Sequence, residues 1–181
     1  VNANDSYTVS QTGSQASFSF DVLPVASRGT VSGSTYFNFA FCDFRAEDNV
    51  NWLAEIPASS AEFPGAEGFF QRFAQGEMIS SQGVLHLVSS RGWVATTSTY
   101  GFDGYQTGAF ANIDGSPQSG YIGFTFMADD GDGDEAHYGY VSLTWDGTDL
   151  TLHGYAWENV GGQGIVAGAG QPVVPGLGGL A

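Results

Sequence analysis

The sequence predicts an all-β fold, a single-domain antiparallel β-sandwich of the jelly-roll type. Apolar and polar residues alternate over short runs, turn-forming residues separate these runs, and 27 of the 181 residues are glycine. Alternation is typical of half-buried strands, and regularly spaced turns are typical of sandwiches and jelly rolls. With 42% hydrophobic and 14% aromatic residues, the chain has enough apolar material to build one core.

The first strands are predicted over residues 7–9 and 16–22, where every second side chain is apolar. In the run 35–44, the odd and the even positions both carry apolar residues, and these two sets face opposite sides of a sheet. We therefore expect a central strand that is covered on both faces. Cys42 lies in this run and is the only cysteine, which excludes an intrachain disulfide. We expect it to be a small core residue, with an exposed thiol that couples two chains as the alternative.

Residues 45–76 are less regular, because Pro57 and Pro64 interrupt the pattern. We expect this segment to be a connection that lies across the sandwich, with a short helical turn at residues 66–74. Strand patterns then resume at residues 84–88, 92–97, 120–126, 138–145, 150–157 and 164–167. The pair Asp146-Gly147 predicts a hairpin between the strands 138–145 and 150–157, since both residue types tolerate the positive φ of tight turns.

The charge balance limits the possible partners. Nineteen carboxylates face four arginines and no lysine, so the formal net charge is −15. Such a chain repels phosphate backbones, which excludes nucleic acid as a partner and favours divalent cations or a high-salt medium. No apolar run reaches the roughly 20 residues that a membrane span requires, and the first residue is expected to be a processed terminus.

Four segments of the last third carry a family resemblance: residues 120–126 (GYIGFTF), 137–141 (HYGYV), 154–158 (GYAWE) and 164–168 (GIVAG). In these segments the chain resembles surface proteins of Gram-negative bacteria that carry a PEP-CTERM-type exosortase sorting signal. The resemblance implies secretion, processing and residence at the cell surface or in an extracellular matrix of exopolysaccharide. It implies no catalytic residues.

The chain is expected to divide into a β-sandwich domain at residues 1–168 and a tail rich in Gly, Ala and Pro at residues 169–181. The tail is interpreted as a linker or docking segment, and the resemblance implies that it leads to a sorting region, which is missing from this sequence. Its apolar residues are the predicted assembly residues, which would pair with a sheet edge or fill a groove of a second copy: Val173, Val174, Pro175, Leu177 and Leu180.

An acidic loop is the candidate metal site, with five carboxylates within seven residues: Asp129, Asp130, Asp132, Asp134 and Glu135. Calcium is the natural cofactor for such a loop, because it takes several oxygen ligands in flexible geometry. The spacing does not fit an EF-hand, and a fully solvated hairpin loop is the alternative. The three histidines have no metal-ligand spacing and are expected to make ordinary hydrogen bonds on strands or loops.

A row of exposed aromatic rings would allow the chain to bind glycans, and the candidates are Trp52, Trp93, Tyr100 and Tyr105. The competing interpretation is that these rings belong to the core, as most rings in strands do.

We therefore expect a non-catalytic structural protein of the bacterial surface that associates with itself into a filament, sheath or matrix layer. The alternative is a calcium-dependent carbohydrate-binding module that holds exopolysaccharide. No nucleophile, nucleotide or zinc motif is present, so an enzyme is not expected. A secreted hydrolase would need a carboxylate pair assembled from distant loops, for which Glu135 and Glu158 are the candidates.

Overall fold

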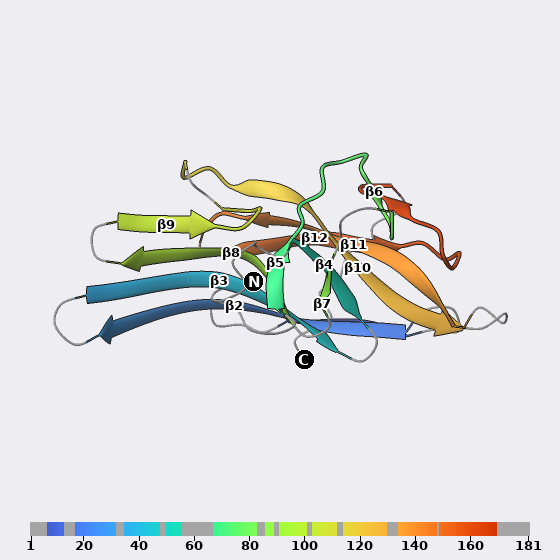
Figure 1. Ribbon diagram of the computed structural model, residues 1–181, viewed down its shortest axis with the longest axis horizontal. Coiled ribbons are helices and arrows are strands. Elements are labelled where there is room, and N and C mark those ends of the chain that lie inside the picture. Colours follow the sequence, from blue (N-terminus) through green and yellow to red (C-terminus); the bar gives the residue numbers. More distant parts are fainter. Residues whose placement is uncertain are drawn as a thin grey trace, which may run out of the picture.

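The computed structural model describes the backbone of residues 7–12, 17–31, 35–47, 50–55, 67–82, 86–88, 91–100, 103–111, 114–129, 134–147 and 149–169. Side chains are described for residues 50–53, 70–82, 108–111, 114–128, 134–147 and 149–169. Every regular element in these ranges is a β-strand, and none of them contains a helix (Figure 1). The all-β class is confirmed for this part of the chain. The described residues therefore contain no helix that is long and apolar enough to cross a membrane.

Thirteen strands are described. They are β1 (Tyr7–Thr12), β2 (Ser17–Val31), β3 (Thr35–Glu47), β4 (Asn51–Glu55), β5 (Glu67–Phe70), β6 (Met78–Ile79), β7 (His86–Val88), β8 (Arg91–Tyr100), β9 (Asp103–Thr107), β10 (Gln118–Asp129), β11 (Asp134–Trp145), β12 (Leu150–Trp157) and β13 (Ile165–Val166). Each strand predicted from alternation overlaps one of these strands and is confirmed.

Eleven of the described strands form one sheet in the order β1-β2-β3-β8-β5-β4-β10-β11-β12, with β7 also paired to β4 and β9 to β8. The pairing is antiparallel except between β5 and β8, which run parallel. β6 and β13 form a separate two-stranded antiparallel sheet. Figure 1 shows β2, β3, β8 and β9 as one group of neighbouring strands, and β10, β11 and β12 as another.

β3 occupies the inner position that the sequence predicted for residues 35–44, between β2 and β8. The side chains of β3, including that of Cys42, lie outside the described side chains. Whether both faces of this strand are covered, and whether Cys42 is a core residue, therefore stay predictions.

The expectation for residues 45–76 was wrong. β4 and β5 both belong to the main sheet, and residues 66–74 contain β5 and a bridge between Phe73 and Tyr121 in place of a helical turn. The reason lies in burial: Trp52 and Leu53 are neighbours in β4 and are 0% and 1% exposed. A strand buried on both faces has consecutive apolar residues, so the alternation that identifies a strand is lost.

The two faces of the β4–β10–β11–β12 part of the sheet carry two apolar clusters. In β10, Ile122, Phe124 and Phe126 all face the larger cluster, since alternate residues of a strand share a face. That cluster also contains Val50, Trp52, Phe70, Phe110, Val141, Leu143, Trp145, Leu150 and Tyr155. The smaller cluster lies on the opposite face, where β6 and β13 cover the sheet, and contains Leu53, Phe73, Ile79, Tyr138, Tyr140, Ala156, Ile165 and Ala167.

The glycine and histidine of the HYGYV segment have structural roles in the pairing of β10 with β11. Gly139 lies opposite Phe124, and a Cβ at position 139 would be only 2.4 Å from Cζ of that ring. His137 lies opposite Phe126 and stacks on it, with ring centroids 5.2 Å apart. These residues of the segment therefore complete the packing of the neighbouring GYIGFTF strand.

The predicted hairpin at Asp146-Gly147 is confirmed. β11 and β12 pair up to Trp145 and Leu150, and the Asp149 N–H donates to Asp146 Oδ1 at 2.7 Å. Gly147 has a φ of +96°, a conformation that glycine adopts without steric cost.

Replacing Gly147 by alanine is expected to lower the free energy of unfolding by about 1 kcal/mol, because a Cβ is strained at positive φ. Gly147→Asn should cost less, since asparagine tolerates this region. Urea unfolding of the two variants measures the difference. An alanine variant as stable as the asparagine variant would contradict this account of the turn.

Candidate binding groove

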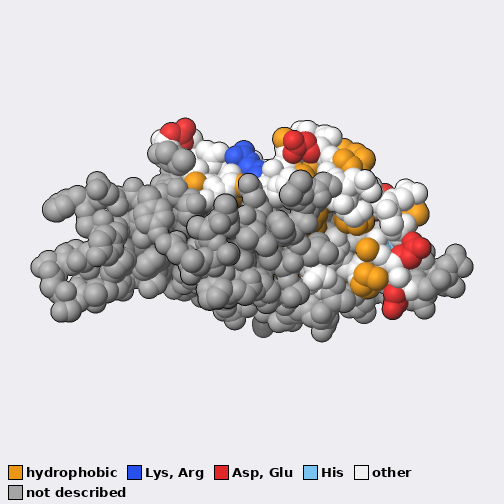
Figure 2. Space-filling view, viewed as in Figure 1, with side chains coloured by type: hydrophobic (Ala, Val, Ile, Leu, Met, Phe, Trp, Pro, Cys, Tyr) orange, Lys and Arg blue, Asp and Glu red, His pale blue; other side chains and the backbone are white. Residues whose placement is uncertain are grey.

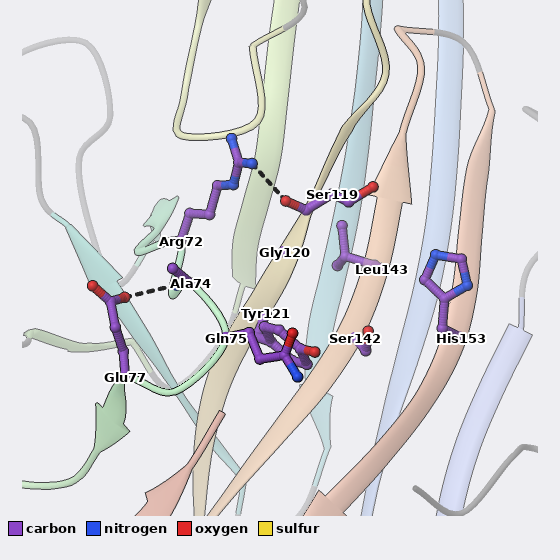
Figure 3. Close-up of a pocket in the computed structure, with 10 residues that line it drawn as sticks. All are labelled: Arg72, Ala74, Gln75, Glu77, Ser119, Gly120, Tyr121, Ser142, Leu143 and His153. Carbon is purple, nitrogen blue, oxygen red and sulfur yellow. Dashed lines mark hydrogen bonds between the residues drawn. The ribbon is translucent and has the colours of Figure 1, made fainter. Parts of the chain in front are cut away.

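An open groove lies on the face of β10, β11 and β12 that is opposite to the larger apolar cluster (Figure 3). Its volume is about 470 Å³. Its polar walls come from four segments of the chain, namely residues 72–77 (Arg72, Gln75, Glu77), β10 (Ser119, Tyr121), β11 (Ser142) and β12 (His153). In Figure 3 the segment 72–77 borders the groove on one side and His153 on the other.

The groove exists because the small sheet covers only part of this face. Ile79 of β6 and Ile165 of β13 pack with Tyr140 in the smaller cluster, where the face is closed and apolar. Toward the start of β10 the face carries small polar residues instead, among them Ser119 and Ser142. Ser119 is exposed and Ser142 half-buried, so the surface is left open to solvent.

A chain of hydrogen bonds crosses the three strands at this end of the groove. Ser119 Oγ lies 2.7 Å from Thr144 Oγ1, which lies 2.8 Å from His153 Nε2. The β11–β12 register shifts between Ser142 and Leu143, beside His153. A bulge of this kind re-aims a side chain, which accounts for a histidine on the groove side of an otherwise alternating strand.

Arg72 closes the top of the groove as drawn in Figure 3. Its Nη1 donates to Gln118 Oε1 at 2.9 Å and its Nη2 donates to the Ser119 carbonyl at 2.5 Å. The guanidinium also lies over the Phe110 ring, 5.4 Å from the centroid, at a distance typical of a cation–π contact. These contacts orient a charged side chain that is otherwise exposed.

Figure 2 shows a basic patch between acidic patches on the described surface. The chain has no lysine, and Arg72 is the one arginine whose side chain is described, so this patch is its guanidinium. In a protein with a net charge of −15, the groove thus contains a local positive charge.

Backbone hydrogen bonds hold the rest of the segment 72–77, on the same side of the groove as Arg72. The Gly76 N–H donates to the Ala167 carbonyl at 2.9 Å, and the Ala167 N–H donates to the Glu77 carbonyl at 2.8 Å. The Glu77 carboxylate accepts the Ala74 N–H through Oε2 at 2.7 Å. The loop that carries Gln75 and Glu77 is therefore attached to the segment that follows β13.

Tyr121 lies on the floor of the groove and meets Tyr140 edge to face, with ring centroids 5.2 Å apart. The Tyr140 hydroxyl donates to the Ala169 carbonyl at 2.7 Å. Burial, and to a smaller extent the neighbouring Tyr121, raise the pKa of Tyr140 above its usual value. The hydroxyl is thus protonated and able to donate at neutral pH.

The predicted calcium loop is described only at its two ends. Asp129 and Asp134 are paired at the end of the β10–β11 hairpin, and Asp134 and Glu135 are exposed. Asp130 and Asp132 lie outside the described residues. Within the described residues no three His, Cys, Asp or Glu side chains are grouped as metal ligands, so calcium stays a prediction.

The predicted glycan platform needs one correction. Trp52 is 0% exposed and packs edge to face on Phe70 and Phe124, at centroid distances of 5.2 and 5.9 Å. It cannot stack on a sugar at the surface, because the residues of the larger apolar cluster bury it. Trp93 lies in β8, Tyr100 ends β8 and Tyr105 lies in β9, with their side chains outside the described ones.

The remaining predicted residues are distributed as follows. The assembly residues Val173, Val174, Pro175, Leu177 and Leu180 lie outside the described residues. His137 and His153 make the ordinary hydrogen bonds expected of them, His137 through Nδ1 to the Glu158 carbonyl at 2.9 Å. Glu158 Oε1 accepts the Val160 N–H at 3.2 Å within its own turn.

Reasoning from the sequence did not identify the groove. Arg72, Tyr121 and His153 are far apart in the chain, and no motif connects them. The one available signal was the run of polar residues at alternate positions of β10 and β11. Such a run marks a surface that faces solvent, and it carries no information about the shape of that surface. The chain matches no protein-family model, no curated protein and no solved structure.

Proposed function

We propose that the chain is a non-catalytic structural subunit of a bacterial surface or extracellular matrix, and that copies associate through the sheet edge at β12. The observation that carries the proposal is the place and composition of β12. It is the terminal strand of the sheet order, and its described strand pairing is with β11 alone. Its sequence, LTLHGYAW, has neither a charged residue nor a proline.

These properties favour strand addition. Soluble proteins usually protect a terminal strand with lysine, proline or inward-pointing charges, because a bare edge pairs with other chains. β12 has none of these residues, although Thr151 and His153 are exposed on it. Among the described residues, the bulge beside His153 is a feature of β12 that protects an edge.

The proposed occupant of this edge is the tail of a second copy, with Val173, Val174, Pro175, Leu177 and Leu180 as the contacting residues. The hydrogen bond from Tyr140 to Ala169 fixes the point at which the tail leaves the smaller sheet. A contact between the tail of one copy and the edge of the next is heterologous, and such contacts repeat without closing, which produces a filament.

Two finer features belong to the same proposal. We infer a β-sandwich, in which the strands at the β2–β3–β8 end of the sheet order cover the larger apolar cluster. We also infer that calcium in the loop between Asp129 and Glu135 reduces the self-repulsion of an acidic subunit. Secretion and residence in exopolysaccharide are proposed on the family resemblance.

Assembly is expected to depend on both partners of the contact. Removal of residues 171–181 should leave single particles, and Thr151→Lys should raise the concentration needed for assembly about tenfold, equivalent to about 1.4 kcal/mol. Val160→Lys adds the same charge to a turn outside β12 and serves as the control, since Val160 is 49% exposed. Negative-stain microscopy and light scattering over a concentration series measure the effect.

If the full chain stays monodisperse at every concentration, the structural subunit is the wrong function. If filaments form equally well from all three variants, assembly is real but β12 is not its site. Chelation of calcium is a separate arm: filaments that dissolve support the metal site, and filaments that persist remove the metal from the proposal.

A further inference from the structure

We propose that the groove bordered by Arg72, Glu77, Tyr121 and His153 is a binding site for a neutral saccharide. The inference goes beyond the assembly proposed above and does not depend on it, because β12 contributes to assembly through its edge and to the groove through one face. None of the residues involved belongs to the aromatic row or to the acidic loop that the sequence marked.

The first argument is the chemistry of the walls. A sugar hydroxyl both donates and accepts, so a sugar site needs donors and acceptors side by side. Glu77 supplies carboxylate acceptors, Gln75 supplies both kinds of group, and Arg72 has five N–H donors, two of which are engaged by Gln118 and Ser119. His153 bonds Thr144 through Nε2 and has a second ring nitrogen.

The second argument is the ring on the floor. Tyr121 is half-buried and lines the groove between these polar groups. Aromatic rings offer an apolar surface to the C–H groups of a sugar while their edges stay polar. A ring flanked by hydrogen-bonding side chains therefore matches a ligand that is apolar on its faces and polar at its rim.

The third argument is rigidity. Arg72 is oriented by Gln118, Ser119 and the Phe110 ring, and His153 by Thr144. The loop of Glu77 is attached by two backbone bonds to Ala167. Groups that are held before a ligand arrives lose little freedom when it binds, and the volume of about 470 Å³ lies in the range of small-molecule sites.

The charges favour a neutral ligand over other classes. Glu77 and a net charge of −15 oppose phosphate groups and acidic polymers, while Arg72 opposes a lone cation. Among the described residues that line the groove, Glu77 and His153 are the only ones of the usual metal-ligand types. An apolar peptide would leave the polar walls unsatisfied, which costs binding energy.

The competing occupant is the chain's own tail, because it begins at the groove. A Cβ at Gly168 would lie 2.8 Å from the Tyr121 hydroxyl and 3.1 Å from Gln75 Cγ, and Ala169 is the last described residue. The test below therefore includes this segment as a peptide.

The experiment uses the full chain and isothermal titration with neutral tetrasaccharides of β-1,4-glucose, β-1,3-glucose, α-1,4-glucose and β-1,4-mannose. We expect at least one to bind, and Glu77→Gln to weaken that binding tenfold or more, since a charged acceptor is lost. His153→Ala should weaken it about fivefold. Raising sodium chloride from about 50 to about 500 mM shortens the Debye length roughly threefold and should change the affinity by less than about twofold.

Asp114→Asn is the matched control. Asp114 is exposed, lies outside the groove, and accepts the Ser116 N–H at 2.9 Å much as Glu77 accepts the Ala74 N–H. It should bind the saccharide as the unchanged protein does. Thermal unfolding of each variant shows that it is folded.

Three outcomes would overturn the proposal. In the first, no tetrasaccharide of the panel binds. In the second, one binds with an affinity that Glu77→Gln and His153→Ala leave unchanged. In the third, a peptide of residues 171–181 fills the groove, as shown by its binding to the unchanged protein but not to the Glu77→Gln and His153→Ala variants, and the sugars do not bind.

Discussion

Replacing Trp52 by alanine is expected to lower the free energy of unfolding by about 3–5 kcal/mol. The indole is 0% exposed and meets Phe70 of β5 and Phe124 of β10 edge to face. It thus joins three strands that are distant in the chain, and its removal leaves a cavity that a sheet cannot close. Urea or thermal unfolding followed by circular dichroism measures the loss.

The control for this prediction is an apolar residue at the surface. Met78 is 56% exposed, so Met78→Ala should change the stability by less than about 0.5 kcal/mol. A loss below about 1 kcal/mol for Trp52→Ala would mean that the ring is not a core residue. The surface role that its sequence context permitted would then have to be considered again.

Replacing Gly139 by alanine is expected to lower the free energy of unfolding by about 1–3 kcal/mol, although alanine is usually tolerated in strands. The added Cβ would lie 2.4 Å from Cζ and 2.8 Å from both Cε atoms of Phe124. That ring cannot withdraw, because it is fully buried against Trp52 and Phe126. Gly139 is not among the described glycines with positive φ, so the cost is steric.

A second change separates this clash from other effects. Phe124→Leu makes room at the ring position, so the double variant should be less destabilised than the sum of the two single variants, by about 0.5–3 kcal/mol. Ser142→Ala, in the same strand but on the other face, should cost less than about 0.5 kcal/mol. Strict additivity of the two changes would refute the contact between Gly139 and Phe124.

Local patterns predicted most of the described strands. In β10, the apolar residues Ile122, Phe124 and Phe126 alternate with Gly123 and Thr125, and this alternation is visible in the sequence and identifies the strand. The same holds for the turn at Asp146-Gly147, because positive φ restricts the residue types that are possible there. β4 was missed because its neighbours Trp52 and Leu53 are both buried, and burial on both faces removes the alternation.

The candidate groove, in contrast, is formed by contacts between distant segments of the chain. Arg72, Tyr121 and His153 meet through the pairing of Phe73 with Tyr121, a bulge in β12 and the limited reach of the small β6–β13 sheet. Each of these is a contact between segments far apart in the chain. No pattern within a single segment encodes it, so the groove could not be predicted.

The sequence by itself determined the all-β class of the described part of the chain, the acidity and the turn at Asp146-Gly147, because each depends on neighbouring residues or on a sum over all of them. Only the tertiary structure decided which rings are buried and where polar groups converge. Trp52 shows the difference: its residue type is compatible with a sugar platform or a core, and its burial between Phe70 and Phe124 makes it a core residue. Burial is a property of the packed fold. For a single side chain it depends on contacts with residues that are far away in the sequence, so the local sequence does not determine it.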